Sequence, residues 1–211
     1  MRIAVFSTPR TCSSFMCYVT SRKFEIQNFR EDVYTHFQQG MQDEKLEFLE
    51  TTDDYVVKLF SSYFHNDKNI KLNSINWNMF DYVFITERMN LVDQMASLYR
   101  RVYTDTHYIN LHDKEIVELY EEHKTYMQLF YNIKTSILSK HKNTFVVNYE
   151  RLQNNPIEYL NSITNLNFTY DHIRRIDVFP STKKTAINYK TYFTNYIELQ
   201  SFVESWNLMK T

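Results

Sequence analysis

Short apolar runs recur along the chain, and four of them have the length and composition of buried strands. Each is rich in β-branched or aromatic residues and is bounded by polar segments, a pattern typical of strands that are covered on both faces. The four runs are "RIAVFST" (2–8), "DYVVKLF" (54–60), "DYVFITE" (81–87) and "NTFVVNY" (143–149).

The segments between these runs have the hydrophobic period of a helix. In one of them Leu91, Met95, Leu98 and Val102 recur on a single face, which predicts an amphipathic helix over 90–103. Strands that alternate with helices indicate a parallel sheet with helices on both faces. We therefore predict that the whole chain forms one three-layer α/β/α domain with a central parallel sheet. Further helices are predicted over 13–22, 41–50, 113–139, 155–166 and 189–208.

Composition and charge narrow the classes of function. The formal net charge of −1 lacks the basic excess of a broad nucleic-acid surface, and no apolar run reaches the roughly 18 residues of a membrane helix. The start "MRIAVFSTPR" is too short for a signal peptide. Cys12 and Cys17 are too few for a disulfide framework or a zinc site. We expect a soluble cytoplasmic protein that binds neither nucleic acid nor a membrane.

Residue usage gives two weaker indications. The chain has 17 tyrosines and one glycine, and it is rich in Asn and Lys. The codons for Tyr, Asn and Lys are AT-rich, which would suit a viral gene and a location in the host cytoplasm. The aromatic content leaves room for a homodimer interface.

A loop suited to hold an anion follows the first predicted strand. In "VFSTPRTCSSF" (5–15) a strand runs into a helix, and the N–H groups at a helix start attract anions. Arg10 adds a guanidinium group that can donate two parallel hydrogen bonds to an anion, and Thr11, Ser13 and Ser14 add hydroxyl groups. The alternative is a helix capped by Ser13 or a neighbour, with a solvated Arg10. The glycines and the lysine of a Walker loop are missing, which argues against ATP hydrolysis.

Two later segments carry further candidate residues. Arg88 ends a predicted strand, and Ser97 lies about two turns into the next helix. This spacing lets both side chains bind one phosphate. The alternative is a surface Arg and a packed Ser. The segment "VVNYERLQNNP" (146–156) ends a strand at Tyr149 and Glu150, where we expect Glu150 to cap a helix or form a salt bridge.

Together these segments resemble the sulfotransferases that use 3′-phosphoadenosine-5′-phosphosulfate (PAPS). The first loop of that family has the pattern P-[KR]-[ST]-G-[ST]-[ST], and residues 9–14 here are PRTCSS. The second signature is a strand, an Arg and a Ser nine residues later, which Arg88 and Ser97 match. The third is YExL followed by Pro, which residues 149–156 match. The three motifs occur in family order within residues 2–166. The resemblance implies a P-loop-like sulfotransferase fold over the whole chain, residues 1–211.

The resemblance implies a set of cofactor contacts. The first loop would bind the 5′-phosphosulfate of PAPS, Arg88 and Ser97 would bind its 3′-phosphate, and the product would be 3′-phosphoadenosine-5′-phosphate (PAP). No metal is implied. Lys183 and Lys184 would cover the nucleotide, or else form a solvated basic turn. The first-loop contacts would come from Pro9, Arg10, Thr11, Cys12, Ser13 and Ser14.

The resemblance also implies catalytic roles. Arg10 stands where many relatives have a catalytic Lys, and it would neutralise charge that develops on the bridging oxygen. A general base would take the acceptor's proton; Glu31 best fits the place of a Glu found after the second strand in several relatives, and His65 is the alternative. Lys58 would contact the transferring group. Each of these side chains is otherwise a surface charge.

Cys12 departs from the family pattern, which has glycine at this place. Glycine takes a positive φ freely and lets the backbone approach a phosphate, whereas a Cβ makes a positive φ cost about 1 kcal/mol. The Cys12 thiol, beside Arg10 and a helix N-terminus, is also a candidate for a lowered pKa.

The sequence thus predicts a sulfotransferase that acts on a hydroxyl or amine of a small molecule, glycan or peptide. Because Cys12 departs from the pattern and the base is uncertain, a non-catalytic relative that binds a nucleotide or a protein is an alternative. A nucleotide kinase on a similar fold is a further alternative, which the missing Walker lysine disfavours.

Overall fold

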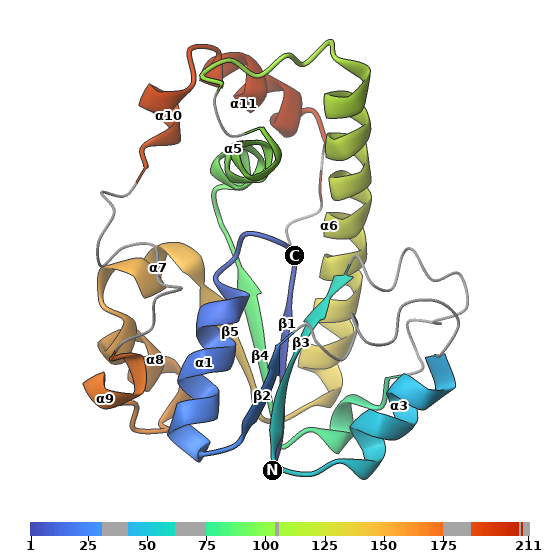
Figure 1. Ribbon diagram of the computed structural model, residues 1–211, viewed down its shortest axis with the longest axis vertical. Coiled ribbons are helices and arrows are strands. Elements are labelled where there is room, and N and C mark those ends of the chain that lie inside the picture. The colour runs from blue at the N-terminus through green and yellow to red at the C-terminus, as the bar shows by residue number, and fades with distance from the viewer. Residues whose placement is uncertain (31–41, 62–74, 104–105, 175–186, 207, 209–211) are drawn as a thin grey trace.

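The computed structural model describes residues 1–30, 42–61, 75–103, 106–174, 187–206 and 208. Within them, helices flank a 5-stranded parallel sheet (Figure 1).

The strands are β1 (Arg2–Ser7), β2 (Gln27–Arg30), β3 (Tyr55–Phe60), β4 (Tyr82–Glu87) and β5 (Thr144–Asn148). The helices are α1 (Ser13–Phe24), α3 (Gln42–Thr51), the 3₁₀ turn η1 (Trp77–Met79), α5 (Leu91–Val102), α6 (Lys114–Lys140), α7 (Tyr149–Asn154), α8 (Pro156–Thr164), α9 (Tyr170–Ile173), α10 (Tyr189–Tyr192) and α11 (Tyr196–Glu204). In this part of the chain no helix is both long and apolar enough to span a bilayer.

The strand order brings the candidate loops together. The strands lie in the order β2-β3-β1-β4-β5, and the register places Ser7 of β1 between Phe60 of β3 and Thr86 of β4. Because the strands are parallel, the loops that follow β1, β3 and β4 leave the same edge of the sheet. Open α/β sheets bind their ligands at this edge.

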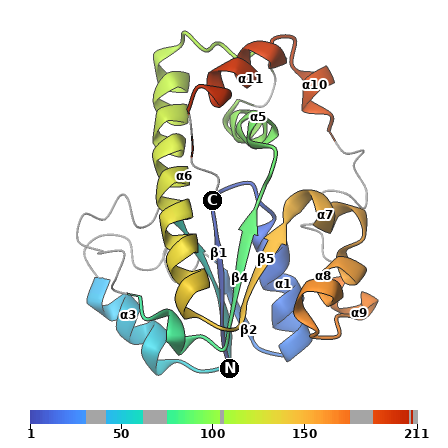
Figure 2. The same cartoon turned by 180° about the vertical axis from the view of Figure 1, so that it is seen from behind.

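Both faces of the sheet are buried, as the apolar runs predict. Successive side chains of a strand point to opposite faces. Ile3 and Val5 of β1 pack in one cluster with α1, α7 and α8, whereas Ala4 and Phe6 pack in another with α3 and α6. Figures 1 and 2 show these helices on the two sides of the sheet. The predicted α/β class with helices on both faces of a parallel sheet is confirmed.

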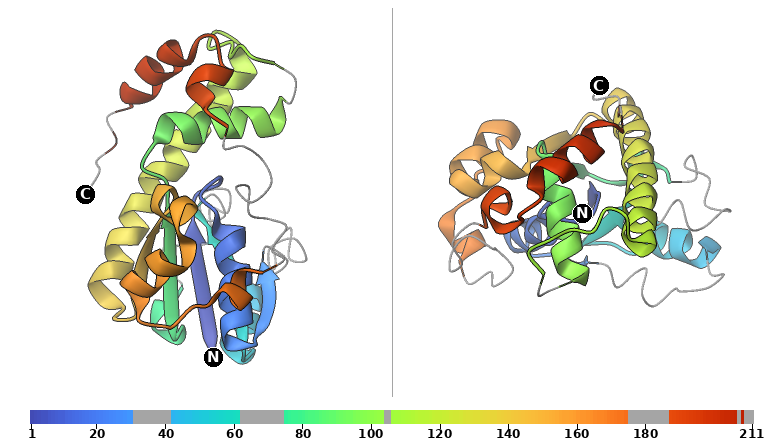
Figure 3. Two further views of the ribbon diagram at one scale, coloured as in Figure 1. Left: turned by 90° about the vertical axis from the view of Figure 1, so that its left-hand side faces the viewer. Right: turned by 90° about the horizontal axis from the view of Figure 1, so that it is seen from above.

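A third cluster lies beyond the carboxyl edge of the sheet. It joins α5, the first half of α6, α10 and α11, with Tyr120 of α6 and Leu199 of α11 fully buried in it. Figure 3 shows α5 and α11 above the ends of the strands. The helices of this cluster therefore lie over the edge at which the candidate loops meet.

The structure corrects the prediction for α5 at one position. Val102 was expected on the buried face, but it is 55% exposed. In this last turn Tyr99 is buried instead, because its ring stacks on Tyr103 and packs edge-on against Phe193.

The segment 189–208, predicted to be helical, has a break near its middle. The segment forms two short helices, α10 and α11, with Asn195 between them. The Asn195 side chain accepts a hydrogen bond from Ile109 N at 3.0 Å and donates one to Ile109 O at 2.6 Å. These contacts hold the chain at the break, and sequence periodicity cannot anticipate them.

The edge strand β2 was not among the predicted runs. Its sequence, QNFR, has one apolar residue and no hydrophobic alternation. Its pairing with β3 is irregular between Asn28 and Arg30. A short strand at a sheet edge needs little apolar surface, so it leaves a weak sequence signal.

Candidate functional site

The loop between β1 and α1 contains two residues with positive φ although it lacks glycine. Cys12 has φ 63° and ψ 22°, and Arg10 has φ 68°, so both residues are left-handed, while Thr11 between them is not. Successive N–H groups form a concave anion site where left-handed residues alternate with right-handed ones, and the positive φ values at Arg10 and Cys12 meet half of that condition. Cys12 therefore takes the conformation that glycine would have, at a cost of about 1 kcal/mol.

The start of α1 has no side-chain cap, so the predicted Ser13 cap is wrong. Cys12 is the N-cap residue, and its carbonyl accepts a hydrogen bond from Met16 N at 3.1 Å. Ser13 itself is buried. The first turn contains no acidic residue, so the positive end of the helix dipole faces the loop without a neighbouring carboxylate from its own turn.

The strain at Cys12 gives a stability prediction. We expect Cys12→Gly to be more stable than Cys12→Ala by about 1 kcal/mol, because both variants lose the thiol but only alanine retains the left-handed penalty. Urea unfolding of the two variants measures the difference.

The control for this comparison is Asn132, an exposed position in the interior of α6. There alanine should be more stable than glycine by about 1 kcal/mol. The same order of stability at Cys12 would mean that the residue does not adopt a positive φ in solution.

The hydroxyl groups of the loop have different surroundings. Thr11 Oγ1 donates to Thr8 O at 2.9 Å and lies 2.9 Å from Thr86 Oγ1, so it braces the loop against β4. Ser14 Oγ accepts a hydrogen bond from Lys58 Nζ at 2.9 Å. Lys58 is 2% exposed and reaches the loop from the neighbouring strand β3. The predicted residues Ser14 and Lys58 therefore lie together, whereas the Thr11 side chain points into the fold.

Ser97 lies next to Arg10, a contact that the sequence did not predict. Arg10 Nε donates to Ser97 Oγ at 3.0 Å across 87 positions of sequence. Ser97 is buried in α5, and Arg10 is exposed. The hydrogen bond joins two of the three sequence motifs directly and orients the Arg10 guanidinium.

Gln94 supports the same loop, and sequence reasoning missed it. Its Nε2 donates to Thr8 Oγ1 at 2.9 Å and to Pro9 O at 2.7 Å, and the side chain is fully buried. The same atom lies 3.5 Å from Nε2 of His123, whose pKa burial lowers to about 4. A glutamine between Leu91 and Met95 on the apolar face of a helix was the available signal, since a buried amide needs polar partners.

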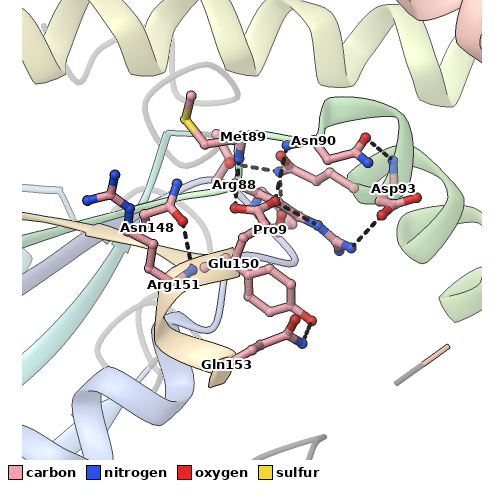
Figure 4. Close-up of polar contacts among 12 residues, drawn as sticks. Pro9, Arg88, Met89, Asn90, Asp93, Asn148, Glu150, Arg151 and Gln153 are labelled. Carbon is pink, nitrogen blue, oxygen red and sulfur yellow. Dashed lines mark hydrogen bonds and ion pairs between the residues drawn. The ribbon is translucent and has the colours of Figure 1, made fainter. Parts of the chain in front are cut away.

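Arg88 is a buried cation in a shell of aromatic rings and carboxylates. Its side chain is 6% exposed, and its guanidinium carbon lies 4.5 Å from the Tyr149 ring centre and 5.7 Å from that of Tyr189. Its Nη2 lies 3.6 Å from Asp93 Oδ2, and its Nε lies 3.8 Å from Glu150 Oε1 (Figure 4). The second and third motifs therefore meet around Arg88.

Glu150 binds the loop that joins β4 to α5. Its Oε2 accepts a hydrogen bond from Met89 N and its Oε1 accepts one from Asn90 N, both at 3.1 Å. Asn90 in turn caps α5 through its side chain, which accepts from Asp93 N. The prediction that Glu150 caps a helix or forms a salt bridge is confirmed, because it contacts both the start of α5 and Arg88.

The predicted lowering of the Cys12 pKa is wrong. Burial raises the pKa of the thiol to about 12, and this outweighs the opposite effect of the nearby Arg88 and Arg10 charges. The thiol therefore stays protonated at neutral pH, which argues against a nucleophilic role.

Four predicted residues lie outside the described part of the chain. They are the candidate bases Glu31 and His65 and the basic pair Lys183 and Lys184. Their roles stay predictions. Among the residues that are described, no group of three or more His, Cys, Asp or Glu side chains is arranged to hold a metal ion.

Comparison with known proteins does not identify a family for this chain. The chain matches no protein-family model, and neither a curated protein nor a solved structure is significantly similar to it. The functional conclusion therefore depends on the residues and contacts described above.

Proposed function

We propose that this protein transfers a sulfuryl group from PAPS to a hydroxyl or amine of a small molecule, glycan or peptide. The hydrogen bond from Arg10 to Ser97 carries the proposal, because it joins two of the sequence motifs at the carboxyl edge of the sheet. The third motif reaches the same region through the contact of Glu150 with Arg88.

The surroundings of the first loop suit a phosphosulfate. Arg10, Lys58 and the uncapped start of α1 place positive charge at the loop. Bound PAPS would supply a sulfuryl group on a bridging oxygen, and Arg10 with the helix start would stabilise the charge that develops there. Lys58, held by Ser14, would contact the transferring group.

The transfer also needs a base. The bond from sulfur to the bridging oxygen breaks as the bond to the acceptor oxygen or nitrogen forms, and the acceptor's proton passes to the base. Glu31 is the first candidate and His65 the second, as the sequence predicts.

Nucleotide binding tests the proposal. In calorimetric titrations we expect PAP to bind at least about tenfold more tightly than ADP, since only PAP carries a 3′-phosphate to pair with Arg88. Arg88→Ala should remove that preference. The matched control is Arg151→Ala, which removes an exposed arginine from neighbouring α7. An absence of PAP binding at millimolar concentration contradicts the proposal.

A nucleotide-binding relative without transferase activity is the second candidate. The two carboxylates against Arg88 and the strained Cys12 favour it. Assays with labelled PAPS and a library of acceptors separate the two functions: tight PAP binding without turnover supports the binder. Tighter binding of ADP than of PAP would instead favour a nucleotide kinase.

A further inference from the structure

We propose that the Glu150 carboxylate occupies an anion site into which the 3′-phosphate of the nucleotide binds by displacing it. The site consists of Met89 N, Asn90 N and the Arg88 guanidinium. This inference rests on the proposed function and adds two things to it. It names the atoms that receive the phosphate, and it identifies a side chain of the protein itself as the competitor.

Three donors converge on the Glu150 carboxylate. Each of its oxygens accepts one backbone N–H at 3.1 Å, and Arg88 Nε approaches Oε1 to 3.8 Å (Figure 4). The two N–H groups belong to the residues that lead into α5, where the helix dipole adds positive charge. A phosphate monoester has three terminal oxygens and a charge near −2, so it suits this donor set better than a carboxylate does.

Arg88 has an N–H group that could donate a hydrogen bond to an anion. Its side chain is 6% exposed, and its Nε makes no hydrogen bond to any residue that the structure describes. The carboxylate oxygens of Asp93 and Glu150 lie 3.6 and 3.8 Å from the guanidinium nitrogens, beyond hydrogen-bond distance. A buried donor left without a close acceptor is costly. A phosphate oxygen bound between Arg88 and the two N–H groups would remove that cost.

Glu150 can leave the site, and a groove lies beside the two residues whose N–H groups it binds. The side chain is 37% exposed, so rotation about its own bonds carries the carboxylate into water. A groove of about 680 Å³ between α5 and α11 is lined by Met89 and Asn90, and Lys190 lines it as well. Glu204 lines the groove too, so the groove brings one positive and one negative side chain close to Met89 and Asn90.

The test replaces Glu150 with its neutral isostere. We expect Glu150→Gln to raise the affinity for PAP about tenfold in calorimetric titrations, because the phosphate no longer displaces a charged competitor from two hydrogen bonds. The affinity for ADP should not change. Glu158→Gln is the matched control, since it removes the same charge from α8, where Glu158 contacts Asn155.

Other outcomes contradict the inference. An unchanged affinity for PAP would show that Glu150 does not compete, and a lower affinity would make it a residue that positions Arg88. Equal gains for PAP and ADP, or a gain in the Glu158→Gln control, would point to a general effect of charge. If neither the wild type nor Glu150→Gln binds PAP, both the proposed function and this inference are contradicted. If the wild type binds PAP and Glu150→Gln does not bind it more tightly, only this inference is contradicted.

A second measurement does not depend on the variant being folded. In NMR spectra of the wild-type protein, the amide signals of Met89 and Asn90 should shift on addition of PAP and not on addition of ADP. PAP binding without movement of these two signals would overturn the inference.

Discussion

We expect Arg10→Ala to lower the rate of the proposed sulfuryl transfer by about two to three orders of magnitude, the usual cost of removing one preorganised group that stabilises developing charge. Ser97 holds the Arg10 guanidinium at 3.0 Å, so its orientation is set before a ligand binds. Release of labelled sulfuryl product from PAPS in the presence of an acceptor measures the rate. The loss should appear in kcat, since the charge develops only during transfer.

The controls for Arg10 separate its charge from its geometry. Arg10→Lys retains the charge but loses the guanidinium and its hydrogen bond to Ser97, so its activity should lie between those of the wild type and Arg10→Ala. Ser97→Ala removes only the orienting hydroxyl and should cost about tenfold. Because Arg10 is exposed, Arg10→Ala should change the free energy of unfolding by about 0.5 kcal/mol or less. A fully active Arg10→Ala variant would remove Arg10 from the catalytic site.

The second large effect is expected in the core. Phe130→Ala should lower the free energy of unfolding by about 3–5 kcal/mol, which corresponds to a fall in Tm of about 10 °C. Phe130 of α6 is fully buried, and its ring stacks on Phe6 of β1 with 5.2 Å between ring centres. The substitution leaves a cavity between the sheet and α6. Urea unfolding followed by circular dichroism measures the loss.

The same helix provides the control. Leu138 is 46% exposed, so Leu138→Ala should cost less than about 1 kcal/mol. Similar losses for the two variants would show that α6 does not cover the sheet with the face that contains Phe130.

Much of the fold follows from local patterns. Each of the four predicted strands is present, and its two ends differ from the predicted ends by no more than one residue. The agreement arises because each strand is an apolar run that must be buried on both faces. Asn90 caps α5 and Pro156 begins α8, in accordance with the local chemistry of helix starts. The polar strand β2 and the break at Asn195 depend on neighbours distant in sequence, so no local pattern could predict them.

The candidate site was predictable as a set of residues but not as a set of contacts. Arg10 and Arg88 were identified because each lies just after a predicted strand, at the edge where parallel strands end, whereas Lys58 was identified through the resemblance to the sulfotransferases. Their partners were not, because a hydrogen bond such as that from Arg10 to Ser97 depends on how α5 packs over the sheet. Gln94 was missed for the same reason, since its amide acquires a role only when Thr8 and Pro9 lie beneath it.

The sequence by itself determined the order of strands and helices, the absence of glycine from the first loop and the positions of its charged residues. Only the tertiary structure decided how Cys12 behaves. Its backbone is left-handed because the loop must turn between β1 and α1, and its thiol has a raised pKa because burial outweighs the neighbouring arginines. The local sequence determines which backbone conformations a residue can adopt and which charges lie near it. Tertiary packing determines which of those conformations the residue adopts and how far its side chain is removed from water.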